Sequence, residues 1–189
     1  RSSDLWDATA WRDVRFRRRL LWLEEVLIDL STVENPHRQQ LDWTLHLAAQ
    51  ALDQSGTPQP FSLSGPLRHM ANATMAPLNG CQPRHFARDG DTVALWLSGD
   101  GELWQGVAPD NPATHDLSYL VIRSHLPQAR FVCLWDFANS APLTEVQVNH
   151  TPVGTQITFW RGERVTHVTL YDAPGKRPDA IFPFAESGT

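Results

Sequence analysis

The segment Leu41–Ala48, LDWTLHLA, alternates polar and apolar side chains with a period of two. Because successive side chains of a β-strand point to opposite faces of a sheet, this segment is predicted to be a strand with one polar face and one apolar face. The polar face carries Asp42, Thr44 and His46. An aspartate and a histidine are costly to bury without partners. The polar face is therefore expected to hold either a hydrogen-bonded His46 or a ligand site.

Short runs of the same kind recur along the chain, bounded by Gly, Pro, Asn and Asp, and helical periodicity is nearly absent. This pattern is typical of a β-sandwich or barrel. Further strands are expected at Val14–Leu23, Glu25–Leu30, Thr92–Gly99, Gly101–Ala108, Ser118–Ser124, Ala129–Phe137, Thr155–Trp160 and Arg164–Asp172. Tight hairpin turns are expected at Ser98–Gly101 and around Gly162. The predicted class is all-β, an antiparallel double-sheet sandwich with few or no helices.

The segment RFRRRLLWLEEVLIDL, residues 15–30, has a second interpretation. Its Arg, Leu and Glu residues favour a helix, but its β-rich surroundings favour two strands with a turn at Glu24–Glu25. As a strand, it would place Arg15, Arg17 and Arg19 on one face, which is expected to be solvated.

One sandwich domain is expected over residues 1–172. Residues 53–90 are dense in Pro, Gly, Ser and Asn and are predicted to form a long irregular excursion. Residues 173–189 show no periodicity and are predicted to form an extended tail. The chain begins without Met and without a signal-peptide pattern, which is interpreted as an internal cut in a longer protein.

Charge and hydropathy exclude two classes of partner. The net charge of −5 and the pI near 5.9 argue against nucleic-acid binding, because no basic stripe is available for phosphates. No run approaches the ~20 apolar residues of a membrane-spanning helix. We therefore expect neither nucleic acid nor membrane as a partner.

Cysteine and tryptophan add two expectations. Cys81 and Cys133 could pair, or Cys133 could be a buried free thiol in its apolar run. Of the eight tryptophans, those in predicted strands are expected in the core: Trp22, Trp43, Trp96, Trp104, Trp135 and Trp160. Trp6 and Trp11, in an N-terminal stretch expected to be irregular, are the surface candidates for stacking against sugars.

The order of several motifs is more specific than any one of them. The Arg-rich segment 15–30 is followed by a polar loop with His37 and then by LDWTLHL. Further along come GVAPDNPATHDLSYLVIRS at 106–124 and ARFVCLWDF at 129–137. This succession resembles the C-terminal β-sandwich region of the heparinase II/III-like polysaccharide lyases, a group that includes related alginate lyases. The resemblance covers Asp4 to Phe137.

The resemblance implies a parent protein with an N-terminal α/α toroid and a galactose-mutarotase-like supersandwich. Such enzymes cleave uronate-containing polysaccharides by β-elimination, which needs a neutralised sugar carboxylate, a base and an acid. Family members use Tyr and His for proton transfer, but His37 and Tyr119 match no family motif. The toroid and the usual His-Asn-Thr segment are absent from this chain. No catalytic residue is therefore assigned, and whether the chain is an enzyme stays uncertain, because it is expected to hold no complete active site. It is expected to support the active-site cleft without acting alone.

The resemblance also implies a metal site, since some relatives hold a structural zinc with two His and one Asp inside this sandwich. His46 would match one histidine, and Asp4, or else Asp7, would match the aspartate. The remaining histidine would lie upstream of this chain. Because two ligands hold zinc poorly, the site is expected to be degraded or empty here, with zinc held only by the full-length parent. No other cofactor is expected.

Acidic polysaccharide and the missing toroid are the expected partners, and the family implies a periplasmic or secreted location. The acidic net charge is an objection that a local Arg patch can outweigh. The alternative is a non-catalytic carbohydrate-binding module. A mutarotase-like epimerase is disfavoured, because it needs a His–carboxylate pair and the remaining histidines are scattered: His69, His85, His125 and His167.

Overall fold

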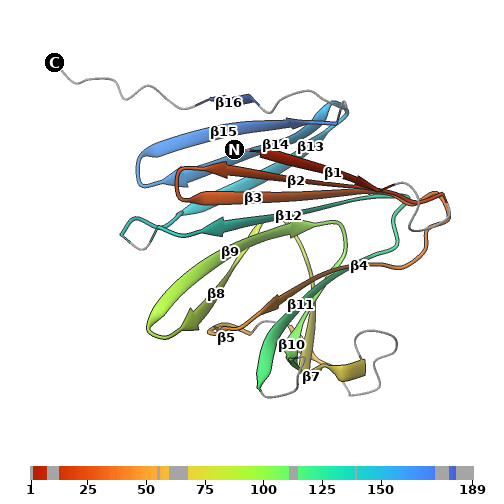
Figure 1. Cartoon of the computed structure of the whole chain (residues 1–189), viewed down its shortest axis with the longest axis vertical. Helices are drawn as coiled ribbons and strands as arrows, with labels where there is room; N and C mark the ends of the chain where they lie inside the picture. Colours follow the sequence, from red (N-terminus) through yellow and green to blue (C-terminus); the bar gives the residue numbers. More distant parts are fainter. Residues whose placement is uncertain are drawn as a thin grey trace. The chain divides into compact units, whose positions relative to one another are not determined.

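The computed structural model describes residues 13–54, 56–59, 68–110, 115–138 and 140–172 in full, and the backbone of residues 2–7 and 179–181. Antiparallel strands make up most of these residues, and no α-helix occurs among them. The all-β sandwich class expected from the sequence is confirmed (Figure 1). Within the described ranges, no helix has the length and apolar character needed to cross a membrane.

The chain divides into two compact units, residues 1–137 and 138–189. The first unit contains a seven-stranded antiparallel sheet. Its strands, in order across the sheet, are β1 (Ser2–Asp7), β2 (Arg15–Leu23), β3 (Val26–Glu34), β12 (Gln128–Asp136), β9 (Asp91–Gly99), β8 (Gln82–Arg88) and β5 (Gln50–Ala51).

A five-stranded antiparallel sheet completes the first unit. Its strands, in order, are β4 (Leu41–Leu47), β11 (Asp116–Ser124), β10 (Glu102–Pro109), β7 (Ala71–Pro77) and β6 (Thr57–Pro58). The second unit holds one four-stranded sheet, in the order β13 (Glu145–Thr151), β14 (Gly154–Arg161), β15 (Arg164–Tyr171) and β16 (Asp179–Ile181).

The core of the first unit lies between its two sheets. Each sheet contributes every second side chain to a single apolar cluster, and we call the face that does so its inner face. The seven-stranded sheet contributes Val33, Phe86, Leu95, Leu97, Ala129, Phe131 and Cys133. The five-stranded sheet contributes Leu47, Leu103, Leu120 and Ile122, with Trp43 and Leu45 partly buried against them. Each fully buried large side chain stabilises the fold by about 1.5–3 kcal/mol relative to an exposed one.

The strand β12 is central in its sheet and is buried on both faces. Val132 and Leu134, which alternate with the core residues Phe131 and Cys133, are also fully buried. This agrees with the nearly continuous apolar sequence of the strand, since a strand with one solvated face would alternate.

Of the two hairpin turns predicted from the sequence, the one around Gly162 is confirmed and the one at Ser98–Gly101 is wrong. The strands β2 and β3 form a hairpin with Glu24 at a positive φ of 50°, so the helical interpretation of residues 15–30 is wrong. The turn between β14 and β15 contains Gly162 at a φ of 59°. The turn at Ser98–Gly101 instead connects β9 of the seven-stranded sheet to β10 of the five-stranded sheet, so these two strands form no hairpin.

Two expectations about irregular segments were wrong. The stretch 53–90 contains β7 and β8, and the N-terminal stretch contains β1. The segments ANATMAP and QPRHFAR are poor in β-branched residues; their pairing with β10 and β9 outweighs that weak local preference. In the expected tail, β16 pairs with β15. The single domain over residues 1–172 stays a prediction, because the two units are described separately.

The arginines of β2 also differ from expectation. Arg17 and Arg19 are 3% and 5% exposed, whereas Arg18 on the other face is half-exposed. The prediction that Arg15, Arg17 and Arg19 share a solvated face is therefore wrong for Arg17 and Arg19, which are buried. Alternation predicts which arginines share a face but not whether that face is covered.

We predict that Gly101→Ala destabilises the first unit. A Cβ atom at Gly101 would lie 1.9 Å from the carbonyl oxygen of Arg123 on β11. Because that atom belongs to the backbone, β11 would have to move, with an expected loss of about 1–3 kcal/mol in the free energy of unfolding. Urea unfolding measures the loss. The neighbouring exposed substitution Glu102→Ala is the control and should stay within about 0.5 kcal/mol; equal losses in both variants would contradict the prediction.

Candidate functional site

The polar face predicted for Leu41–Ala48 exists. In the five-stranded sheet, Asp42 lies opposite Arg123 and His46 lies opposite Tyr119 on the neighbouring strand β11. The alternate residues Trp43 and Leu45 pack against the core. We call the face that carries Asp42, His46, Arg123 and Tyr119 the outer face of the five-stranded sheet. The prediction of a shared face is confirmed.

Asp42 is largely covered on the outer face, and it is paired. Arg123 donates from Nε to Asp42 Oδ1 at 2.8 Å and from Nη2 to Asp42 Oδ2 at 2.9 Å. The two side chains are only 12% and 14% exposed. The guanidinium carbon lies 5.8 Å from the ring centroid of Trp104 on β10. This two-bond geometry over an aromatic ring is among the stronger ionic arrangements in proteins.

His46 is held against the ring of Tyr119. The two ring centroids are 3.9 Å apart, and the planes are inclined by 33°. Burial lowers the pKa of His46, and the Asp110 carboxylate opposes this shift. Burial also raises the pKa of Tyr119, and the Asp42 carboxylate adds to that shift. Both rings are therefore neutral near pH 7, and a neutral imidazole can accept a proton or bind a metal ion.

The expected metal ligands lie on different sheets. His46 is on β4, an edge strand of the five-stranded sheet, while Asp4 is on β1, an edge strand of the seven-stranded sheet. The side chains of Asp4 and Asp7 lie outside the described residues. Among the side chains that the structure describes, no three His, Cys, Asp or Glu residues gather as a metal site. A neutral His46 could serve as a zinc ligand, but one histidine is too few ligands to hold a zinc ion. The His46–Asp4 site stays a prediction.

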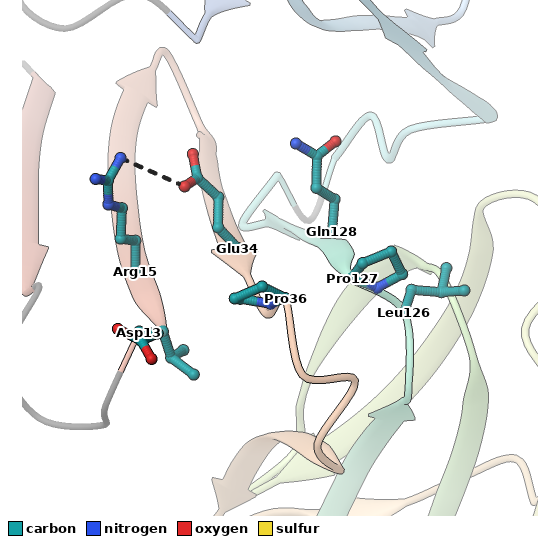
Figure 2. A pocket seen from close by; sticks show the side chains of 8 residues that line it. Asp13, Arg15, Glu34, Pro36, Leu126, Pro127 and Gln128 are labelled. Atoms are coloured by element: carbon teal, nitrogen blue, oxygen red, sulfur yellow. Dashed lines mark ion pairs between the residues drawn. The ribbon is translucent and has the colours of Figure 1, made fainter.

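A groove of about 1030 Å³ lies where β2 begins, β3 ends and β12 begins (Figure 2). It is lined by Asp13, Val14, Arg15, Glu34, Pro36, Leu126, Pro127 and Gln128. In Figure 2 the side chain of Arg15 reaches toward Glu34 on the next strand, at 3.6 Å. Both side chains are more than half exposed, so this ion pair contributes little.

His37 lies beside this groove. Its Nε2 atom is 3.2 Å from Asp13 Oδ2, and both side chains are more than half exposed. The buried Asn35 braces the loop, since its side-chain amide donates to the Gln39 carbonyl oxygen at 2.7 Å and its backbone N–H donates to the Pro127 carbonyl oxygen at 2.7 Å. His37 and Tyr119 therefore lie on different parts of the first unit, and the structure does not bring them together.

Three aromatic rings stack at the far end of β2. The Phe137 ring lies 5.3 Å from the Trp22 ring, with an interplanar angle of 20°, and 6.3 Å from the Trp135 ring, with an angle of 6°. Trp22 and Phe137 are 46% and 42% exposed, and Trp135 is half-buried. We call these three residues the aromatic stack. Sequence reasoning missed it, although three aromatic residues near two strand ends were the available signal.

The burial of the tryptophans agrees with the prediction for some residues and differs from it for others. Trp96 and Trp104 are buried as expected, and Trp43 and Trp160 are half-buried. The core prediction was wrong for Trp22. Among the two surface candidates, Trp6 lies in β1 with its side chain outside the description, and Trp11 lies outside the described residues.

Cys81 and Cys133 are both free thiols, so the pairing alternative is not adopted. Burial raises the pKa of the Cys81 thiol to about 12 and raises that of Cys133 well above its usual range. Because the thiolate is the reactive form, both are expected to be unreactive in the folded chain.

Sequence reasoning missed the His–carboxylate pairs His37–Asp13, His85–Asp53 and His115–Asp110. His85 Nδ1 lies 3.0 Å from Asp53 Oδ2, and Asp53 Oδ1 accepts the backbone N–H of His85 at 3.1 Å. Both side chains are more than 40% exposed. The pair joins β8 to the segment after β5, which gives it a local structural role.

No protein-family model matches the chain, and no curated protein matches it. The family expected from the order of motifs therefore stays an expectation.

We predict that Asp42→Ala lowers the free energy of unfolding by about 3–5 kcal/mol, because it leaves the largely covered Arg123 charge without its partner. Urea unfolding measures the change. Glu34→Ala, which breaks the exposed Arg15–Glu34 pair, is the matched control, with an expected change of about 0–1 kcal/mol. The double variant Asp42→Leu/Arg123→Met should recover most of the loss. A loss in Asp42→Ala no larger than in Glu34→Ala would contradict this account.

We also predict that His46 titrates below its ordinary pKa of 6.5. Since the unfolded chain binds the proton more tightly, the His46 contribution to stability is fully present above pH 6.5 and is lost as the pH falls below it. NMR titration of the imidazole measures the pKa directly. Tyr119→Leu should move it back toward 6.5, because the smaller side chain covers less of the imidazole, whereas Tyr119→Phe should not. A His46 midpoint at or above 6.5 in the wild-type chain would refute the prediction.

Proposed function

We propose that this chain is the β-sandwich portion of a polysaccharide lyase that depolymerises uronate-containing glycans by β-elimination. In this proposal it supports an active-site cleft completed by a helical toroid and does not act alone. The observation that carries the proposal is the outer face of the five-stranded sheet. There, a histidine, a tyrosine and an arginine over a tryptophan lie on neighbouring strands.

These groups match what a uronate glycan presents. Sugar hydroxyls need donors and acceptors, which the neutral His46 and Tyr119 side chains supply. Sugar carboxylates need a cation, and Arg123, which is paired with Asp42, lies four residues along β11 from Tyr119 on the same face. A supporting surface also needs a fixed geometry, and the Asp42 carboxylate holds the guanidinium in place with two hydrogen bonds.

The same contacts argue against elimination by this chain alone. The charge of Arg123 is already balanced by Asp42, and the rings of His46 and Tyr119 contact each other. Elimination needs a base, an acid and a cation that converge on one sugar. The proposal therefore places the chemistry in the parent protein, with no cofactor required and with a structural zinc only in the parent. Its expected location is periplasmic or secreted.

The alternative function is a non-catalytic carbohydrate-binding module. The aromatic stack favours it, because exposed aromatic rings held on strands are suited to stack against sugar rings.

Affinity electrophoresis in gels containing alginate, heparin or a neutral glucan tests the proposal. We expect the chain to be retarded by the uronate polymers and not by the glucan. His46→Gln should weaken the retardation several-fold, whereas His125→Gln, an exposed histidine in a loop outside the outer face, should not. Equal mobility in all three gels would refute the proposal.

An absorbance assay for unsaturated uronate separates the lyase from the binding module. The lyase proposal expects product from the full-length parent and none from this chain. Glycan binding by the chain combined with an inactive parent would leave the binding module as the function.

A further inference from the structure

The inner face of the seven-stranded sheet is only partly covered. One cross-strand row on this face runs from Leu95 through Trp135 and Leu27 to Trp22. Exposure rises along it: Leu95 is fully buried, Trp135 and Leu27 are half-buried, and Trp22 is 46% exposed. The five-stranded sheet therefore covers β9 and β12 more completely than the end of β2, where Trp22 stays nearly half exposed.

The aromatic stack at this more exposed end is held by regular structure. Trp22 and Trp135 lie within the strands β2 and β12. Phe137 directly follows β12, and its backbone N–H donates to the Glu25 carbonyl oxygen at 3.0 Å in the β2–β3 turn. Rings fixed in this way lose little freedom when a ligand binds, so the stack is preorganised.

A fixed cation lies on the same inner face. Arg18 precedes Trp22 by four residues on β2, which places their Cα atoms about 13 Å apart along the strand. Arg18 donates from Nε to Asp29 Oδ1 at 3.0 Å and from Nη2 to Asp29 Oδ2 at 2.6 Å. Asp29 is only 4% exposed, whereas Arg18 is 46% exposed. The Nη1 atom of Arg18 has no partner among the described residues, so it is available to an anion.

We propose that the aromatic stack and Arg18 form a subsite for a uronate oligosaccharide. One sugar ring packs its C–H face on the exposed part of the Trp22 ring, which is stacked on Phe137, and the carboxylate of a sugar further along accepts hydrogen bonds from Arg18. This inference rests on the proposed function for the class of ligand. It assigns the contact to the seven-stranded sheet, whereas the proposed function depends on the five-stranded sheet.

The charged residues near the cross-strand row that ends at Trp22 determine which way round the oligosaccharide binds. The exposed Glu24 and Glu25 lie in the turn beyond Trp22, and their carboxylates repel a uronate group at that end. The carboxylate-bearing end therefore lies toward Arg18. The charged groups on both sides of the stack fit a sugar chain better than an apolar protein segment, which would cover them without offering hydrogen bonds.

Titration calorimetry with alginate-derived and heparin-derived oligosaccharides tests the subsite. Trp22→Ala should weaken binding about tenfold, as expected for an anchoring aromatic residue, and Trp22→Phe should recover most of the affinity. Leu126→Ala is the matched control, because Leu126 is also 44% exposed but lies beside the groove at the opposite end of β2. It should change the affinity less than about twofold. Near-ultraviolet circular dichroism and urea unfolding check that each variant folds.

The role of Arg18 is tested by Arg18→Gln/Asp29→Asn, which keeps the shape of the pair and leaves no buried charge. This double variant should lose the preference for uronate oligosaccharides over neutral ones. Unchanged preference would overturn the role of Arg18.

The outcomes separate the two proposals. Wild-type binding that is unchanged in Trp22→Ala overturns the subsite and leaves the proposed function standing. Absence of any wild-type binding to uronate oligosaccharides overturns both. A change in oligomeric state in Trp22→Ala, with sugar binding unchanged, would assign the stack to a protein contact and would overturn the subsite.

Discussion

The contact between the inner faces of the two sheets in residues 1–137 determines every other feature of this unit. Leu95, Phe131 and Cys133 from one sheet meet Leu120 and Ile122 from the other in one apolar cluster. Because the strands alternate, burying these residues fixes which side chains point away from the cluster. The polar groups of the five-stranded sheet and the more exposed end of the seven-stranded sheet both follow from where this contact begins and ends.

Each of the two candidate surfaces carries an Asp–Arg ion pair, and the two pairs differ in how much of the arginine is exposed. On the outer face, Asp42 and Arg123 are both nearly buried, so each depends on the other. On the inner face, Asp29 is buried but Arg18 is half-exposed, so one side of the pair is fixed and the other reaches solvent. The first arrangement favours rigidity, and the second leaves a positioned cation accessible to an anion. An ion pair in a sheet can thus serve structure or recognition, depending on how much of the cation is covered.

Alternation and turn residues were enough to predict the fold class, the central strands and the polar face of β4. They failed for β7 and β8, whose sequences have little preference for strands and depend on pairing with distant segments. The Asp42–Arg123 and His46–Tyr119 contacts could not be predicted, because the register between β4 and β11 brings them together and no local pattern encodes that register. The exposure of Trp22 was missed for a related reason. Alternation predicts the face of a residue but not how far the opposite sheet extends.

The edges of these sheets also bear on how the chain can assemble. The strands β5 and β6, which end the two sheets of the first unit, have two residues each, and β6 contains Pro58. So short an edge presents almost no unpaired backbone, and proline removes one of its donors. The opposite edges of the two sheets are the longer strands β1 and β4, which offer more backbone to a further strand from another molecule. This asymmetry limits edge-to-edge aggregation at one side of each sheet.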